Sequence, residues 1–258
     1  MERRALDGEM NVLISERLEA DGFMVAFTER AGGVSRDPPF HSLNLGLRCG
    51  DDPANALENR RRVCRAVGVP PFTLVRQVHG ARVVEAEAGR DGAGFADPST
   101  ALGSADAIVT SSPGIALAVL TADCVPVALA DPGRGRFAVV HAGWRGVAEG
   151  VLQSSLGAFE RPADVRAAVG PAVGPDHYEV GEDVARAVSS ACRGGAVTER
   201  MGGRLLLDLP GTVAKILAEL GVGDVDWEPE CTACQPGRFF SHRRDGITGR
   251  QALVAARL

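Results

Sequence analysis

The segment that decides the fold reads IALAVLTADCVPVALADPGRGRFAVVHAGWRG over residues 115–146. It contains three short runs, at 115–120, 125–130 and 136–142, in which apolar residues stand at consecutive positions rather than at every second position. Short runs of this kind indicate strands, and consecutive apolar positions indicate strands that are covered on both faces. The segment therefore predicts a layered fold, in which helices or a second sheet cover each sheet.

Similar apolar runs occur along the rest of the chain and predict further strands at 23–28, 73–78, 82–86, 107–110, 165–169, 204–209 and 252–258. Between them, Asp52 can cap a helix that begins at Pro53, and helical patterns cover roughly 146–159, 179–192 and the residues from Pro210 to Leu220. The irregular segments at 29–51, 87–104 and 170–177 are long for a compact domain, which indicates that they are either functional or mobile.

Length and composition indicate one globular domain. The chain has 258 residues, of which 45% are hydrophobic and 24% charged, and it contains no internal repeat or low-complexity linker. The first residues show no clear pattern, so we expect a poorly ordered N-terminal extension over 1–20 and a single domain over 21–258.

The charge pattern argues against nucleic-acid and membrane partners, since the formal net charge of −5 is spread along the chain. The N-terminus has no secretory signal pattern, and no segment approaches the roughly 20 apolar residues of a membrane span. We therefore expect a cytoplasmic protein. In that compartment the six cysteines are kept reduced and are available for metal binding or nucleophilic chemistry.

Two histidines and one cysteine stand at the ends of predicted strands, where sheets present functional groups. They are His79 in RQVHG, Cys124 in TADCVPV and His141 in VVHAGWRG. Three such donors suit a catalytic zinc site that keeps a fourth position open. Their spacings of 45 and 17 residues match no local metal motif, so a buried structural thiol and two hydrogen-bonded histidines are an open alternative at this point.

Taken together, the motifs resemble the laccase-domain family, also called the multicopper polyphenol oxidoreductase, purine nucleoside phosphorylase or peptidoglycan editing factor family. The resemblance implies an α/β (α+β) fold, a layered α-β-β-α sandwich with mixed sheets. It also implies that His79, Cys124 and His141 bind Zn²⁺ and form the catalytic centre. The segments that carry it run in order from residue 27: FTERAGGVS (27–35), SLNLGLRCGDDPANALENR (42–60), RQVHGARVV (76–84), ADAIVT (105–110), LTADCVPV (120–127), VVHAGWRG (139–146), GPAVGPDHYEVGEDV (170–184), LDLP (207–210) and CTACQPGRFFSHRRDGITGR (231–250).

The activity implied by the resemblance is phosphorolysis of adenosine, inosine and methylthioadenosine, with deamination of adenosine as a second reaction. The substrates would then be a purine nucleoside and phosphate. Copper oxidation is not expected as the native activity, because a multicopper site needs many imidazoles and this chain has five histidines and no His-x-His pair. Copper would bind only as an adventitious metal in vitro.

Basic residues are needed for phosphate, since the chain has no Walker-type loop. Arg145 is the first choice, because it follows His141 by four residues at the start of a predicted helix. Arg76 precedes His79 by three residues, which places the two on opposite faces of a strand unless a turn intervenes. Arg243 ranks lower, and each of these arginines has the alternative of a solvated surface position.

Three polar residues complete the predicted substrate contacts. Asn44 can bind ribose or base, although an asparagine in a loop is often a turn former. Asp123 can orient a ligand histidine or merely end its strand, and Gln77 has the same status.

Other readings stay open. Cys231 and Cys234 form a CxxC pair without a second such pair, and we interpret them as structural. His177 stands near a position where the family often has cysteine, and it either replaces that residue or has no role. Cys124 with a histidine base could form a metal-free thiol hydrolase. A role in editing peptidoglycan precursors is the remaining alternative. The sequence does not determine the oligomeric state.

Overall fold

Two sheets form the centre of the molecule in the computed structural model, which describes residues 1–6, 8–193, 195–227 and 229–258. Within these residues the first sheet is antiparallel and runs in the order β1 (Glu2–Ala5), β2 (Asn11–Ile14), β3 (Phe23–Thr28), β13 (Gln251–Arg257) and β6 (Ala116–Thr121). The second sheet is mixed and runs in the order β12 (Asp224–Trp227), β9 (Arg166–Val169), β7 (Val125–Asp131), β8 (Arg136–Ala142), β5 (Ala107–Thr110) and β4 (Val83–Glu85). Only the outer pairs β12–β9 and β4–β5 of the mixed sheet are parallel.

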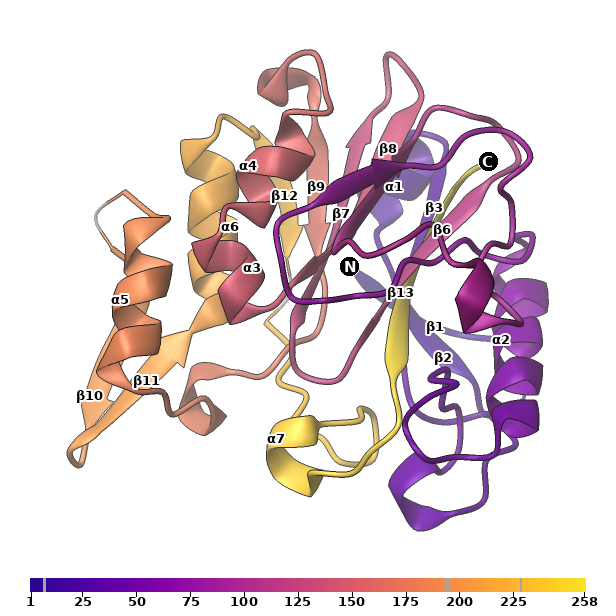
Figure 1. The fold of residues 1–258 in the computed structure, drawn as a ribbon, viewed down its shortest axis with the longest axis horizontal. Coiled ribbons are helices and arrows are strands. Elements are labelled where there is room, and N and C mark those ends of the chain that lie inside the picture. Colours follow the sequence, from indigo (N-terminus) through magenta and orange to yellow (C-terminus); the bar gives the residue numbers. More distant parts are fainter. Residues whose placement is uncertain (7, 194, 228) are drawn as a thin grey trace.

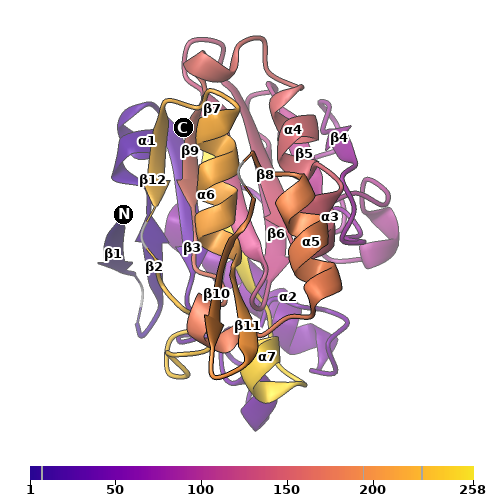
Figure 2. The same ribbon diagram turned by 90° about the vertical axis from the view of Figure 1, so that its left-hand side faces the viewer.

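Helices cover the outer face of each sheet (Figure 1). The antiparallel sheet is covered by α2 (Pro53–Val67), and the mixed sheet by α3 (Trp144–Ala148), α4 (Val151–Leu156), α5 (Glu182–Ser190) and α6 (Leu209–Glu219). Figure 2 shows this second helical layer toward the viewer, with the hairpin of β10 (Val197–Met201) and β11 (Arg204–Asp208) beside it. The remaining helices are short: α1 (Glu16–Ala20), α7 (His242–Asp245) and the 3-10 turns η1 (Pro38–Phe40), η2 (Pro98–Thr100), η3 (Pro162–Asp164) and η4 (Pro175–His177).

Three apolar clusters separate these layers. Phe27, Val119 and Val139 belong to the cluster between the two sheets. Val63 of α2 packs on the antiparallel sheet, and Ile216 of α6 on the mixed sheet. Consecutive residues of β7 are all buried, because neighbouring side chains enter two different cores. The predicted α-β-β-α sandwich with doubly covered strands is therefore confirmed.

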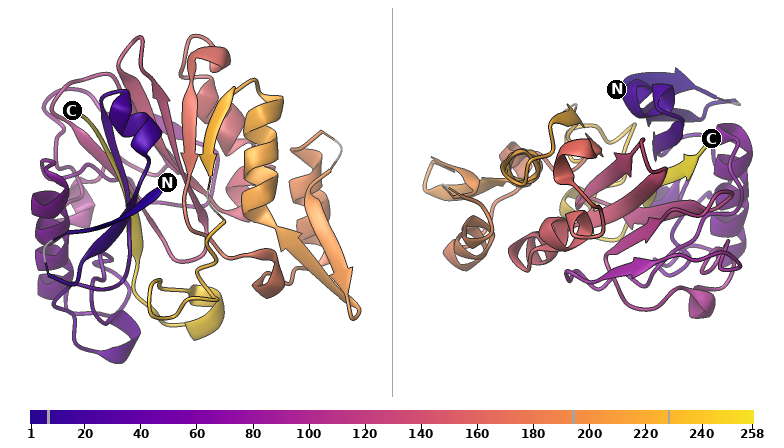
Figure 3. Two further views of the ribbon diagram at one scale, coloured as in Figure 1. Left: turned by 180° about the vertical axis from the view of Figure 1, so that it is seen from behind. Right: turned by 90° about the horizontal axis from the view of Figure 1, so that it is seen from above.

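The N-terminal strands belong to the antiparallel sheet. β2 pairs with β3, and Figure 3 shows from behind that these indigo strands lie beside the yellow C-terminal strand β13. The domain boundary placed at residue 21 stays a prediction. Among the described residues, every helix is too short or too polar to cross a bilayer.

The helix predicted from Pro53 is confirmed. The Asp52 carboxylate accepts a hydrogen bond from the Ala54 amide at 2.9 Å, and Gly68 ends the helix at a φ of 72°. The stretch predicted as one helix over 146–159 forms α3 and α4 instead, because Gly150 adopts a left-handed φ of 87° between them.

The strand predicted at 73–78 is wrong. Thr73 and Arg76 make only isolated bridges, to Leu117 and Ser104. The Gln77 amide binds the backbone of Leu120 instead, so a side chain replaces part of a strand ladder here. The segment therefore runs as an irregular connection beside the end of β6, which brings its last residues to the site described next.

Candidate metal centre and its cavity

Three segments that are distant in sequence meet where the two sheets adjoin. His79 follows the irregular connection, Cys124 lies where the chain passes from β6 to β7, and His141 lies near the end of β8. Their donor atoms all lie within 4.8 Å of one another, and the two imidazole rings meet edge to face with centroids 4.8 Å apart. The structure thus brings together the three predicted ligands, which we call the triad.

The backbone is held in an uncommon conformation at two of these segments. His79 has a φ of 62°, and Asp123, next to Cys124, has a φ of 95°. Non-glycine residues adopt such angles at a cost and only where the surroundings fix them. At His79 the Asp106 carboxylate fixes the backbone, because it accepts hydrogen bonds from the amides of Val78, His79 and Gly80 at 3.2, 2.9 and 2.7 Å.

Asp106 also orients the second histidine of the triad. Its Oδ1 lies 2.8 Å from Nδ1 of His141, and both side chains are buried. Burial alone would raise the pKa of the Asp106 carboxyl, but the hydrogen bonds from His141 and from the backbone outweigh it and lower the pKa. Because the carboxylate binds Nδ1 of His141, Nε2 is the ring nitrogen left to act as a ligand beside Cys124 and His79. Sequence reasoning missed Asp106, although an acidic residue directly before the apolar run 107–109 was a usable signal.

Cys124 and His141 shift each other's pKa toward a pair of thiolate and imidazolium, and a metal ion that binds here takes the place of the imidazolium proton. Burial alone would raise the pKa of the Cys124 thiol, but the imidazoles of His141 and His79 lower the pKa to about 6. Burial would likewise lower the pKa of His141, but Cys124 and Asp106 raise the pKa to about 9. A thiolate therefore forms easily beside two imidazoles. This donor set suits zinc and other thiophilic ions.

Gly143, two residues after His141, lies against the triad at a point where a side chain would not fit. A Cβ atom at this position would lie 3.1 Å from Sγ of Cys124 and 3.1 Å from Cδ2 of His79. Because these contacts are tighter than ordinary van der Waals packing, any larger residue would push the ligands apart.

The triad lines a cavity of about 550 Å³, a size typical of small-molecule sites. Its other lining residues come from loops, helices and strand ends around both sheets. Those with polar or charged side chains are Arg48, Cys49, Arg60, Arg76, Gln77, Thr121, Asp123, Tyr178, His242, Arg243 and Arg250.

Four of the predicted substrate contacts therefore line the cavity. The Gln77 side chain is engaged by the Leu120 backbone, at 2.8 and 2.9 Å. Asp123 accepts hydrogen bonds from Thr232 Oγ1 at 2.6 Å and from the Arg243 amide at 2.5 Å. Gln77 and Asp123 thus position the cavity wall, whereas the guanidinium groups of Arg76 and Arg243 are exposed.

Asn44 and Arg145 lie outside the cavity lining. Asn44 is fully buried, and its amide binds Gly46, Asp51 and the Arg250 backbone, so it holds loops together. The Arg145 guanidinium stacks on the neighbouring Trp144 ring, 4.7 Å from its centroid.

Arg48, Arg60, Arg250 and Tyr178 were not singled out by the sequence. Arg60 is buried and donates to the carbonyl oxygens of Leu45, Gly94 and Phe95, so it supports the loops. Arg250 donates to nearby carbonyls in the same way. The Tyr178 ring carries the Arg243 guanidinium 5.0 Å from its centroid.

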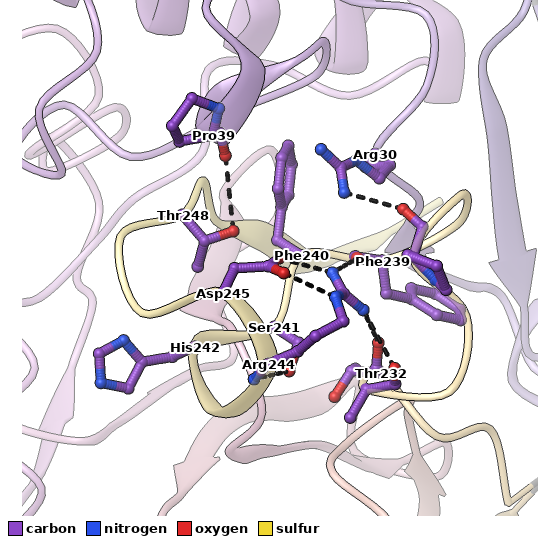
Figure 4. A network of polar contacts seen from close by, with 12 residues as sticks. Arg30, Pro39, Thr232, Phe239, Phe240, Ser241, His242, Arg244, Asp245 and Thr248 are labelled. Carbon is purple, nitrogen blue, oxygen red and sulfur yellow. Dashed lines mark hydrogen bonds and ion pairs between the residues drawn. The ribbon is translucent and has the colours of Figure 1, made fainter.

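Arg244, next to Arg243, anchors the loop that carries α7 (Figure 4). Its guanidinium donates to the carbonyl oxygens of Thr232 and Phe239, at 2.8 and 3.1 Å, and pairs with Asp245. Ser241 caps the short helix through the Arg244 amide. Arg244 is therefore occupied in structure, and Arg243 is the arginine of this pair that lines the cavity.

The family model described as "Multi-copper polyphenol oxidoreductase laccase" matches residues 24–257. Among relatives, the chain is 44% identical over 235 residues to the purine nucleoside phosphorylase Rv2149c of Mycobacterium tuberculosis H37Rv, covering 88% of this chain and 89% of that one. It is 35% identical over 244 residues to the purine nucleoside phosphorylase YfiH of Escherichia coli K12, covering 93% and 96%.

Solved structures show the same fold. YlmD from Geobacillus stearothermophilus superposes with a TM-score of 0.88 at 33% identity, covering 92% of each chain. A hypothetical protein YfiH from Bacillus licheniformis superposes with a TM-score of 0.88 at 31% identity, covering 98% of each chain.

Proposed function

The chain belongs to the multi-copper polyphenol oxidoreductase laccase family, whose members similar to it include proteins named purine nucleoside phosphorylases, and from this premise we propose that it is a zinc-dependent purine nucleoside phosphorylase. The observation that carries the proposal is the cavity of about 550 Å³ that joins the triad to exposed guanidinium groups. One chamber thus offers donors for a metal and cations for a phosphate.

Zinc is the metal that we propose for the triad. One thiolate and two imidazoles make a borderline-soft set of three donors, and the Asp106 contact to His141 is the outer partner expected of such a site. Zinc bound there would supply a Lewis acid to the cavity. A laccase would need a copper cluster rich in imidazole, and the chain has five histidines in all.

Phosphate binding is assigned to Arg48, Arg76 and Arg243. All three are exposed and line the cavity with the triad. Arg76 is held by Ser104 Oγ at 3.0 Å, and Arg243 donates one hydrogen bond to the Glu179 carbonyl at 3.2 Å, so each keeps further N–H groups for an anion. Guanidinium groups bind phosphate in a bidentate manner. Arg145, which the sequence favoured for phosphate, lies outside the cavity lining, so this proposal gives it no direct contact with phosphate.

The nucleoside is assigned to the part of the cavity lined by Tyr178 and Thr121. Burial raises the pKa of Tyr178 to about 12, so its ring is a neutral platform for a purine. Among the described residues, Thr121 Oγ1 is the buried side-chain polar atom that lacks a hydrogen-bond partner. Because buried hydroxyls usually have a partner, we assign this one to the substrate.

In the proposed reaction, a phosphate oxygen forms a bond to the anomeric carbon of the ribose, and the bond from that carbon to the purine nitrogen breaks. The electron pair leaves with the purine, which then takes up a proton. The arginines hold the phosphate in position for this attack.

A product assay tests the proposal. Adenosine, inosine or methylthioadenosine is incubated with and without phosphate, and the products are separated by chromatography. We expect free base and the corresponding pentose 1-phosphate only when phosphate is present. Absence of both products from zinc-loaded protein would contradict the proposal.

Deamination of adenosine is the second activity that we propose for the same triad. It requires a water molecule activated within reach of C6 of the purine, and three protein donors leave room for one at a zinc site. The test is the formation of inosine and ammonia from adenosine without phosphate.

A metal-free thiol hydrolase is the competing function, and one observation favours it. Cys124 has a pKa lowered to about 6 beside His141, whose Nδ1 is held by Asp106, and this order of groups matches a nucleophile, a base and an orienting carboxylate. The two functions differ in their response to chelators. Full activity after zinc removal, together with its loss on alkylation of Cys124, would favour the hydrolase.

A further inference from the structure

A second group of metal-binding side chains lies apart from the triad. His177, Cys231 and Cys234 have donor atoms that all lie within 4.8 Å of one another, and we call them the outer cluster. His177 ends η4, while the two cysteines belong to the segment CTAC that follows β12. The two cysteines also line a separate cavity of about 250 Å³ that shares no residue with the cavity of the triad.

We propose that the outer cluster is a second binding site for zinc or another thiophilic divalent ion, formed by Cys231, Cys234 and His177. Two thiolates and one imidazole exclude magnesium and calcium, which prefer oxygen donors. The CxxC spacing is the usual way in which one short segment supplies two thiolates to one zinc ion.

The geometry is close to that of a loaded site. In a tetrahedral zinc site, bond lengths of about 2.0–2.3 Å place neighbouring ligand atoms about 3.5–3.8 Å apart. The distance from Cys234 Sγ to His177 Nδ1 is already 3.7 Å. Since the donor atoms lie within 4.8 Å of one another, movements of about 1 Å close the set. His177 and Cys234 are exposed, so these movements do not disturb packing.

The hydrogen bond with Cys231, burial and the nearby Asp176 raise the pKa of the Cys234 thiol to about 11, so the second thiol loses its proton only when a cation binds. The Gly174 amide donates to Cys231 Sγ at 3.2 Å, which is a contact that stabilises a thiolate. Asp176, Asp208 and Glu230 line the neighbouring cavity, so water or a carboxylate can occupy the fourth position of the ion. Cys231 and Cys234 are both free thiols in the structure.

An ion at the outer cluster would fasten the wall of the larger cavity. Thr232, which lies between the two cysteines, donates to the Asp123 carboxylate at 2.6 Å, and Asp123 precedes Cys124 of the triad. His177 precedes Tyr178, which lines the cavity. The ion would therefore cross-link two loops that carry cavity residues, and we assign it a structural role.

Zinc stoichiometry under reducing conditions tests the proposal. The full chain is loaded with zinc, passed over a chelating resin and analysed by mass spectrometry of the metal. We expect about two zinc ions per chain, and about one after Cys234→Ser, after His177→Ala, or after Cys124→Ser in the triad. His41→Ala, an exposed histidine outside both groups, is the matched control and should retain both ions.

Each result separates the two sites. Retention of one ion by Cys124→Ser and its loss in the Cys124→Ser/Cys234→Ser double variant would support the outer cluster even if the triad bound no metal. One ion in the unaltered chain that is unaffected by Cys234→Ser and His177→Ala would overturn the proposal. A disulfide between Cys231 and Cys234 that persists under reductant, seen as a mass lower by two hydrogens, would overturn it too.

Cobalt provides a check that does not depend on metal content alone. In the Cys124→Ser variant, the outer cluster is the remaining group of the described residues whose donors lie close enough to hold one cobalt ion together, so we assign it a thiolate-to-cobalt charge-transfer band. We expect such a band on cobalt addition and its weakening after Cys231→Ser or Cys234→Ser. Absence of the band from folded Cys124→Ser protein would contradict the proposal.

Discussion

The triad and the outer cluster contain the same kinds of donors in different surroundings. In the triad, His79 is exposed, Cys124 half-buried and His141 buried, the Asp106 carboxylate fixes the His141 ring, and the donors face a cavity of about 550 Å³. In the outer cluster, two of three donors are exposed and the adjoining cavity measures about 250 Å³. The donor types alone thus do not distinguish a catalytic metal site from a structural one. Enclosure and the groups behind the ligands make the difference.

The largest expected effect comes from removing one donor from each group in turn. Cys124→Ser or His141→Ala should lower kcat/KM for phosphorolysis by more than about 100-fold, which exceeds the effect usual for an outer partner of a ligand. Cys234→Ser should leave kcat/KM within a few-fold of the unaltered chain, because the outer cluster touches no substrate. Steady-state kinetics measure both. Equal losses of kcat/KM in both groups of variants would contradict the distinction between a catalytic triad and a structural outer cluster.

A smaller effect is expected from the carboxylate that only the triad possesses. Asp106→Asn removes the charge on Nδ1 of His141 and one acceptor of the turn at His79, so zinc affinity at the triad should fall about 10-fold to 100-fold. Competition with a chromophoric chelator measures it. Asp52→Asn, which keeps a capping side chain on α2, is the matched control and should change nothing. Unchanged affinity in Asp106→Asn would contradict the orienting role.

The tight packing of the triad predicts an effect of intermediate size for Gly143→Ala. Overpacking costs about 1–3 kcal/mol, and the new methyl group would separate Cys124 from His79, so zinc affinity should fall about tenfold. Gly223→Ala meets no atom within 4 Å and provides the control. If Gly143→Ala bound zinc as tightly as the control, the triad would be looser than its contacts indicate.

The smallest effect is expected from the link between the two groups. Thr232→Val removes the hydrogen bond to Asp123 and should lower the free energy of unfolding by about 1–2 kcal/mol and zinc retention at both groups only a few-fold. Thr121→Val, the same change at a buried hydroxyl without a partner in the described residues, should leave zinc content unchanged and raise KM for the nucleoside. Denaturant unfolding and metal analysis compare the pair. Identical behaviour of the two variants would show that the link has no role.

Much of the fold could be predicted because its signals are local. β3, β7 and β8 are apolar runs, and α2 has a capping aspartate, a proline and a terminal glycine at the expected positions. The prediction failed at 73–78, where composition suggested a strand but a side chain satisfies the backbone of β6. It also missed β12, whose sequence DVDW is short and half polar.

The site was only partly predictable for a different reason. Spacings of 45 and 17 residues carry no metal signal, and the convergence of the triad depends on how the two sheets meet. The family resemblance supplied the ligands. The outer cluster was hidden because its CxxC pair lacks its third donor nearby in sequence, since His177 lies 54 residues before Cys231.

The passage of the chain from β6 to β7 has a consequence for folding. Cys124 lies between a strand of one sheet and a strand of the other, while His141 belongs to the second sheet alone. The segment before His79 is tied to β6 of the first sheet through the two hydrogen bonds between Gln77 and Leu120, so we expect metal capture to follow the docking of both sheets. The rate at which a refolding chain binds zinc at the triad would therefore report the rate at which the two sheets dock. Early release of the ion on heating would report that the sheets part before either one melts.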